Sequence, residues 1–234
     1  EEIAILEERS CWAEDWNTVK VSEGFKPNYL HRVMFYGNIF LGAFNDTLEV
    51  SKGFFKHSGI NNATLRNVTV GNNSLIENIG SYINNYSIGD GCHISNLSIM
   101  ETTEGATYGE GNLISVLNEI GEGNLVLFRD LNSQFAAFMV NHFEDKTLKE
   151  TVGRLIKEDI KLHQPEHAWI GNNVKIVNTK DLTNTIVFDD CEIYGASRLS
   201  DCTLLSSKDA SVYIGTGVIC ENSIISNGTS IINS

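Results

Sequence analysis

A large apolar residue recurs at every sixth position between residues 70 and 100, and this period constrains the fold more than any other feature. The positions are Val70, Ile76, Tyr82, Ile88, Ile94 and Met100. A period of six fits neither the turn of an α-helix nor the simple alternation of a strand. It is typical of a solenoid, in which short strands alternate with turns and one residue per turn points to a common axis. The sequence therefore predicts a mainly β fold, a parallel β-helix of hexapeptide repeats.

The residues between these apolar positions suit sharp corners. Asn, Asp and Gly tolerate left-handed backbone angles better than other residues, and they occupy positions 72, 73, 84, 85, 90 and 91. Asn62, in the segment Asn62-Ala63-Thr64, is interpreted as a corner residue that belongs to an asparagine ladder, in preference to a glycosylation acceptor.

The pattern predicts five segments. The six-residue repeat breaks after Met100 and resumes at Ile170. The expected order is an N-terminal cap segment at 1-30, a first β-helix stretch at 31-100, a loop and strand excursion at 101-131, a helical hairpin at 132-165 and a second β-helix stretch at 166-234. Because the last repeat would leave a hydrophobic end uncovered, we expect either further coils in a longer protein, which we favour, or another chain that covers this end.

The expected helical hairpin carries apolar stripes that need a covering surface. The first stripe consists of Phe135, Phe138, Met139, His142 and Phe143. The second helix is expected to begin with a capping box, in which Thr147 is the cap and Glu150 its partner. We expect the hairpin to pack on the solenoid or on a neighbouring subunit.

Charge and composition argue against several classes of protein. The net charge is −13, and the lysines and arginines form no cluster suited to phosphates, so no nucleic acid is expected as a partner. The sequence has no apolar run long enough for a membrane span. Its five cysteines lack the spacing of a zinc site, and no metal is expected. Without a visible signal peptide, and with cysteines that suit a reducing compartment, a cytoplasmic location is expected.

The Ile/Val-Gly pairs and the regularly spaced small residues resemble the bacterial hexapeptide-repeat superfamily of left-handed β-helices. The chain is still more similar to one uncharacterised bacterial family in that superfamily. The matching segments are Lys56-His57-Ser58-Gly59, Asn62-Ala63-Thr64-Leu65, Asn67-Val68-Thr69-Val70-Gly71, Ser115-Val116-Leu117-Asn118-Glu119 and Ile176-Val177-Asn178-Thr179. The resemblance implies a left-handed β-helix that continues beyond residue 234. It also implies a homo-oligomer, often a trimer, with acyl-CoA or acyl-carrier protein as donor and no covalently bound cofactor.

Acyltransferases of this superfamily typically use a histidine as general base, and two histidines are candidates here. His93 precedes the inward Ile94 and is expected to project outward from a face of the solenoid. His57 lies beside a turn glycine in a segment that matches the uncharacterised family. A surface or packing role is the competing interpretation for both.

The excursion supplies two further candidates. Glu119 could orient a catalytic histidine, and Asn118 is a candidate for substrate binding; capping of a backbone N–H is the alternative for the glutamate. The remaining acidic residues of this segment are interpreted as a solvated surface: Glu101, Glu104, Glu110 and Glu122.

Two functions therefore remain open. The first is a transferase-like protein that transfers an acyl group to a sugar or a similar small acceptor, or that is linked to nucleotidyl-sugar chemistry. The second is a non-enzymatic β-helical scaffold or binding module.

Overall fold

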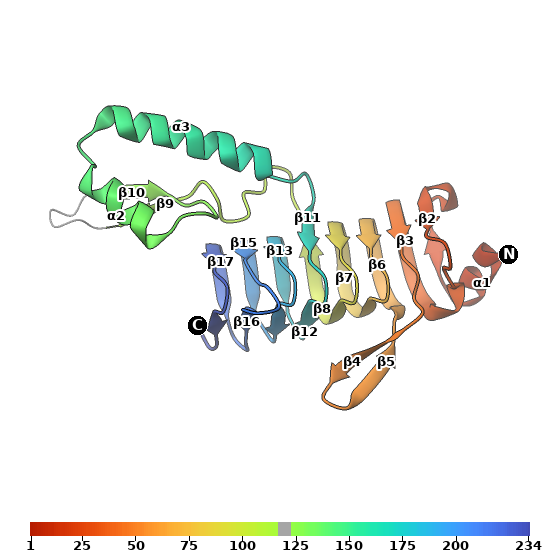
Figure 1. Cartoon of the computed structure of the whole chain (residues 1–234). Coiled ribbons are helices and arrows are strands. Elements are labelled where there is room, and N and C mark those ends of the chain that lie inside the picture. Colours follow the sequence, from red (N-terminus) through yellow and green to blue (C-terminus); the bar gives the residue numbers. More distant parts are fainter. Residues whose placement is uncertain (117–122) are drawn as a thin grey trace.

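A computed structural model describes residues 1–116 and 123–234 of the chain. The fold is mainly β, and within the described residues 14 strands form one sheet, here called the parallel stack (Figure 1). Its strands are β1 (Trp12–Ala13), β2 (Val19–Val21), β3 (Leu30–Leu41), β6 (Gly59–Val70), β7 (Leu75–Ile88), β8 (His93–Glu101), β11 (Ala168–Ile170), β12 (Lys175–Val177), β13 (Asp181–Val187), β14 (Glu192–Tyr194), β15 (Arg198–Leu204), β16 (Tyr213–Ile214), β17 (Ile219–Ile225) and β18 (Ser230–Ile231).

Isoleucines stacked at the same level of successive parallel strands form the centre of the core. The residues that pair in succession are Ile60, Ile76, Ile94, Ile176, Ile193, Ile214 and Ile231. The first six have no exposed surface, and burial of each side chain contributes roughly 1.5–3 kcal/mol. The inward positions expected at Ile76 and Ile94 are therefore confirmed.

The six-residue count fails at Tyr82. The register between β7 and β8 shifts between Ile79 and Tyr82, so Ile83 is the fully buried residue and Tyr82 is partly exposed. The Tyr82 hydroxyl instead donates a hydrogen bond to Oε2 of Glu101 over 2.9 Å. An irregularity of one residue moves the side chain to the other face of the strand.

Asparagines in the left-handed region mark the bends of the long strands. Asn62, Asn78, Asn96 and Asn178 all have φ between 52° and 56°. Their side-chain amides form the expected ladder, with N···O distances of 3.4 Å from Asn62 to Asn78, 3.4 Å from Asn78 to Asn96 and 2.9 Å from Asn96 to Asn178.

The predicted corner positions were right in part. Asn73, Asn85 and Gly91 have positive φ, whereas positions 72, 84 and 90 do not. Two of these latter residues act through their side chains, because Oδ1 of Asn72 accepts from the Ala43 amide and Oδ1 of Asp90 accepts from the Asn72 amide. Polar side chains at the corners thus stabilise the next level of the stack.

The N-terminal segment lies against one end of the parallel stack (Figure 1). It comprises helix α1 (Glu2–Glu8) and the short 3-10 helices η1 (Trp16–Thr18) and η2 (Pro27–Tyr29) around β1 and β2. A hairpin of β4 (Thr47–Ser51) and β5 (Phe54–His57) projects from the stack between β3 and β6.

The segment between β8 and β11 forms an insertion with its own small core. It contains the antiparallel pair β9 (Leu113–Ser115) and β10 (Asn124–Val126), and helices α2 (Ser133–Asn141) and α3 (Lys146–His163). Met139 and Val140 pack with Leu125 of β10, so part of the helical stripe is buried within the insertion, not on the stack as expected. No helix in the described part of the chain is both long and apolar enough to span a bilayer.

Two details of the insertion correct the sequence-based expectations. Asp145 caps α3 by accepting from the Leu148 amide over 2.9 Å, so the cap assigned to Thr147 was wrong. Glu110 is only 2% exposed and binds Arg129 through Nε at 3.1 Å and Nη2 at 3.3 Å. This buried ion pair joins the two ends of the β9–β10 segment, whereas a solvated Glu110 had been expected.

The asparagine ladder leads to a prediction about stability. The substitution Asn96→Ala should lower the free energy of unfolding by about 1–2 kcal/mol. Alanine is disfavoured at positive φ, and the substitution removes the side chain that forms two hydrogen bonds of the ladder. Asn96→Gly should lower it less, because glycine relieves the backbone strain. Urea denaturation followed by circular dichroism measures both. Asn227→Ala is the matched control, since Asn227 is exposed and has no positive φ. Equal stability of Asn96→Ala and this control would contradict the role of the ladder.

Candidate functional site

The insertion leaves and rejoins the parallel stack at a single junction. Thr102, directly after β8, accepts a hydrogen bond at Oγ1 from the Ala168 amide over 3.1 Å. Its carbonyl accepts from Nδ2 of Asn85 over 3.1 Å. The exit and the return of the chain are thereby tied to the same corner of the stack.

Two hollows of about 420 Å³ each adjoin this junction, and both are lined by Glu166 and His167. We call the two hollows together the junction site. The first is bounded by the outgoing chain and the end of α3, with Thr102, Thr103, Glu104, Lys161 and Gln164 among its lining residues. The second lies along the corner asparagines, with Asn38, Asn67, Thr69 and Ser87 in its wall.

Hydrogen bonds hold the walls of the first hollow in place. The Tyr108 hydroxyl donates to the Pro165 carbonyl over 3.1 Å, and Thr203 Oγ1 donates to the Tyr108 carbonyl over 2.7 Å. Gln164 donates to the Ala106 carbonyl. Burial raises the pKa of Tyr108 to about 12, so its phenol remains a donor at neutral pH. Tyr108 also has a left-handed backbone (φ 56°), a strained conformation of the kind that surrounding contacts must maintain.

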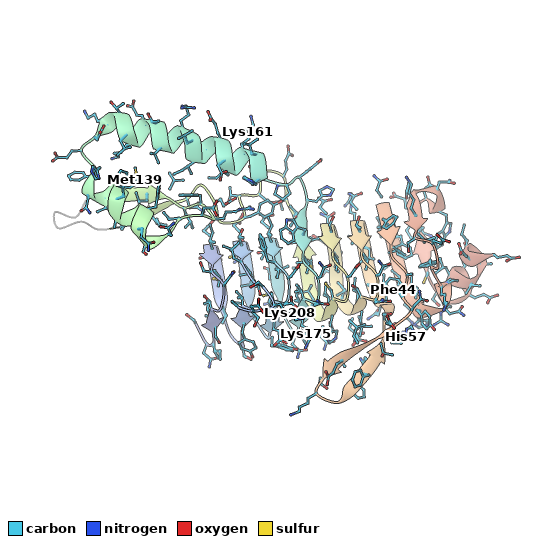
Figure 2. The ribbon with its side chains drawn as sticks, in the orientation of Figure 1. Phe44, His57, Met139, Lys161, Lys175 and Lys208 are labelled. Carbon is cyan, nitrogen blue, oxygen red and sulfur yellow. The ribbon has the colours of Figure 1, made fainter. Side chains whose placement is uncertain are left out.

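The junction site combines an accessible imidazole with groups of both charges. His167 and Glu166 are exposed, and Glu104 and Lys161 face the same hollow. Figure 2 shows Lys161 on α3, above the stack. An imidazole within reach of a bound hydroxyl or amine can act as a general base, while a lysine can bind an anionic group.

The candidate His57 is held as a packing residue at the base of the β4–β5 hairpin (Figure 2). Its ring stacks on Tyr29 with 3.7 Å between centroids and 12° between planes. Its Nδ1 lies 2.8 Å from the Ser58 carbonyl oxygen. His57 lines none of the hollows described here, so its geometry favours the packing interpretation.

The candidate His93 is shielded from solvent, although it precedes the inward Ile94. Only 5% of the residue is exposed, and neither ring nitrogen has a hydrogen-bond partner among the described residues. Burial lowers the pKa of His93, Glu77 opposes this shift, and Lys56 and Lys175 reinforce it. Lys56 forms an ion pair with Glu77 over 2.6 Å. His93 is thus covered by its neighbours and lines none of the hollows described here, which favours the packing interpretation.

Asn118 and Glu119, like Glu122, lie outside the described residues. In residues 1–116 and 123–234, no three His, Cys, Asp or Glu side chains gather closely enough to hold a metal ion.

The sequence pattern did not single out the junction site. His167 is adjacent to the point where the repeat resumes, but Asn85, Thr102 and His167 come together only when the insertion closes. The breaks of the repeat after Met100 and before Ile170 do indicate this region, since binding residues concentrate where loops leave a rigid scaffold, but they did not identify His167.

The unpartnered imidazole of His93 leads to a prediction about stability and pH. His93→Leu should raise the free energy of unfolding at pH 7 by about 1–3 kcal/mol, because it removes two buried polar atoms without partners. Leucine also matches Leu75, the register partner of His93.

The pH dependence should change in the same variant. Because the folded-state pKa of His93 lies below its unfolded value, the unfolded chain binds more protons as the pH falls below about 6.5. The wild type should thus lose stability between pH 7 and pH 5, and His93→Leu should lose less. Urea titrations at both pH values test this, with the exposed His167→Gln as control. An identical pH dependence in wild type and His93→Leu would contradict it.

The comparisons with known proteins give a family without a described activity. An "Uncharacterized protein" of Treponema pallidum (strain Nichols) is 25% identical over 246 residues, which cover 97% of this chain and 33% of the relative. The chain thus spans about a third of the length of that relative. A family model described as "Domain of unknown function (DUF4954)" matches residues 1–234. The chain therefore belongs to the DUF4954 family.

Proposed function

We propose that the parallel stack is a left-handed β-helix of the hexapeptide-repeat superfamily. Successive parallel pairing, buried isoleucines at matched levels and left-handed asparagine corners support this assignment. The homotrimer implied by the resemblance is part of the same proposal.

We further propose that the chain is transferase-like and that the junction site transfers an acyl group to a hydroxyl or amine of a small acceptor. The observation that carries this proposal is the position of His167, which lines both hollows while His57 and His93 line neither. A general base must approach the proton that it removes to within hydrogen-bond distance, and of these three histidines only His167 combines exposure with a cavity.

The reaction would follow the usual course of acyl transfer from a thioester such as acyl-CoA or acyl-carrier protein. The acceptor oxygen or nitrogen attacks the thioester carbonyl, and its proton passes to the imidazole of His167. The C–S bond then breaks, and the imidazolium returns the proton to the leaving thiolate. Glu166, next to His167, would stabilise the imidazolium, and Lys161 would attract an anionic part of the donor.

A binding module without enzymatic activity is the second candidate. It is favoured by a separate observation, a row of exposed aromatic and polar side chains on the outer side of the parallel stack. Trp12 is 49% exposed there and packs against Tyr36 with 5.4 Å between the ring centroids. Such a surface can bind a ligand without any group for transfer chemistry.

The transferase proposal predicts the effect of removing the imidazole. The full-length protein should release free thiol from acetyl-CoA or an acyl-carrier protein in the presence of a suitable sugar or amine acceptor. His167→Asn should reduce the rate by about 100-fold or more, the usual contribution of a general base. A colorimetric thiol assay with a panel of donors and acceptors measures this rate.

His163→Asn is the matched control, because His163 is also exposed but does not line the junction site. Its rate should equal that of the wild type. Thiol release that is unchanged in His167→Asn, or absent for every donor in the wild type, would contradict acyl transfer at this site and favour the binding module.

A further inference from the structure

The outer side of the first strands carries two parallel rows of side chains. The buried residues Phe35, Leu65, Ile83 and Met100 point into the core, so the residues on either side of each point outward. One row consists of Trp12, Met34, Thr64, Tyr82 and Ile99, and the other of Tyr36, Arg66, Asn84 and Glu101. The register pairs Tyr36 with Arg66, Arg66 with Asn84, and Asn84 with Glu101.

A hollow of about 440 Å³ lies within these rows. It is lined by Tyr36, Thr64, Arg66, Tyr82, Asn84 and Glu101. It is separate from the junction site, with which it shares no lining residue. The hollow has the composition of a small-molecule site, in which aromatic surfaces stand beside a few fixed polar groups.

The polar groups of this hollow are partly fixed. The Tyr82 hydroxyl donates to Oε2 of Glu101 over 2.9 Å, which leaves the other carboxylate oxygen to accept from a ligand. This hydrogen bond, more than any other interaction, raises the pKa of Tyr82. Among the described residues, no carboxylate forms an ion pair with Arg66, so its guanidinium can donate to a ligand.

The charges in the hollow indicate the class of ligand. One guanidinium and one carboxylate give no net charge, so the hollow has no electrostatic preference for an anion such as a phosphate. Donors from Arg66, Asn84 and the hydroxyls stand beside acceptors from Glu101 and Asn84. Many donors and acceptors together suit a ligand with many hydroxyl groups.

The aromatic rings add a second requirement. Sugar rings have an apolar C–H face that packs against the face of an aromatic ring, while their hydroxyls form hydrogen bonds at the rim. Tyr36 lies on β3 and Tyr82 on β7, two strands apart through β6, or roughly 10 Å at the usual strand spacing. Trp12 extends the aromatic surface beyond Tyr36. Because Tyr36 belongs to one row and Tyr82 to the other, the arrangement suits successive sugar rings that cross the strands diagonally.

We propose that this hollow binds a short neutral oligosaccharide, with Tyr36, Tyr82 and Trp12 as stacking surfaces and Arg66, Asn84 and Glu101 as hydrogen-bonding partners of its hydroxyls. This proposal does not depend on acyl transfer or on the junction site.

The test is a titration of the full-length protein with cellotriose, xylotriose and maltotriose, followed by calorimetry and by tryptophan fluorescence. At least one of these trisaccharides should bind saturably and perturb the tryptophan fluorescence, to which the exposed Trp12 contributes. Trigalacturonate and an extended apolar peptide serve as charged and non-sugar probes, and each should bind more weakly than the best neutral trisaccharide.

Variants locate the site. Tyr82→Ala should weaken binding by about tenfold or more, because it removes a ring and the partner of Glu101. Tyr82→Phe should cause a smaller loss, since the ring remains. Tyr213→Ala is the matched control, because Tyr213 stacks on Tyr194 elsewhere on the chain with 6.2 Å between centroids, and its affinity should be that of the wild type. Circular dichroism of each variant verifies folding.

Three outcomes would overturn the proposal: no binding of any neutral trisaccharide, tighter binding of trigalacturonate or the peptide, or full affinity in folded Tyr82→Ala. Loss of thiol release in His167→Asn with unchanged trisaccharide binding would support two independent sites.

Discussion

The backbone pairing between β8 and the strands that follow the insertion is the interaction on which the rest of the structure depends. His93, Ile94 and Ser95 pair with Lys175, Ile176 and Val177, although the whole insertion separates them in sequence. Parallel pairing satisfies the backbone groups of both halves, and Ile94 and Ile176 become neighbours in one core. If this pairing failed, each half would expose a hydrophobic end and an unpaired strand edge.

The junction follows directly from that pairing. Because β11 continues the stack above β7, the chain must return to the corner at which it left, and the bond between Thr102 and the Ala168 amide closes that corner. His167 is thereby brought beside Asn67 and Asn85, which lie on earlier strands. The scaffold positions the site, while the insertion supplies its second wall through Lys161 and Gln164.

Much of the core could be predicted because each matched level requires an apolar residue, as in the succession of Leu65, Ile83 and Met100. Ile76 and Ile94 follow the six-residue period and are fully buried. The period could not locate the bulge that exposes Tyr82, since a shift of one residue leaves large apolar residues such as Ile83 available on either side. Nor could the period show that His93 is buried, because the residues that surround it, Glu77, Lys56 and Lys175, come from three other strands. The residues that line the junction site are also far apart in the sequence, so the period could not bring them together.

The closure between Thr102 and Ala168 has a consequence for folding kinetics. Pairs such as β6 with β7 join residues that are close along the chain, and such contacts form at a small cost in loop entropy. The contact of β8 with β12 closes a much longer loop and therefore costs more loop entropy. This cost falls if the insertion first forms its own small core around Met139 and Leu125, because the ends of the loop are then closer. Early folding of the insertion would then accelerate the pairing of β8 with β12.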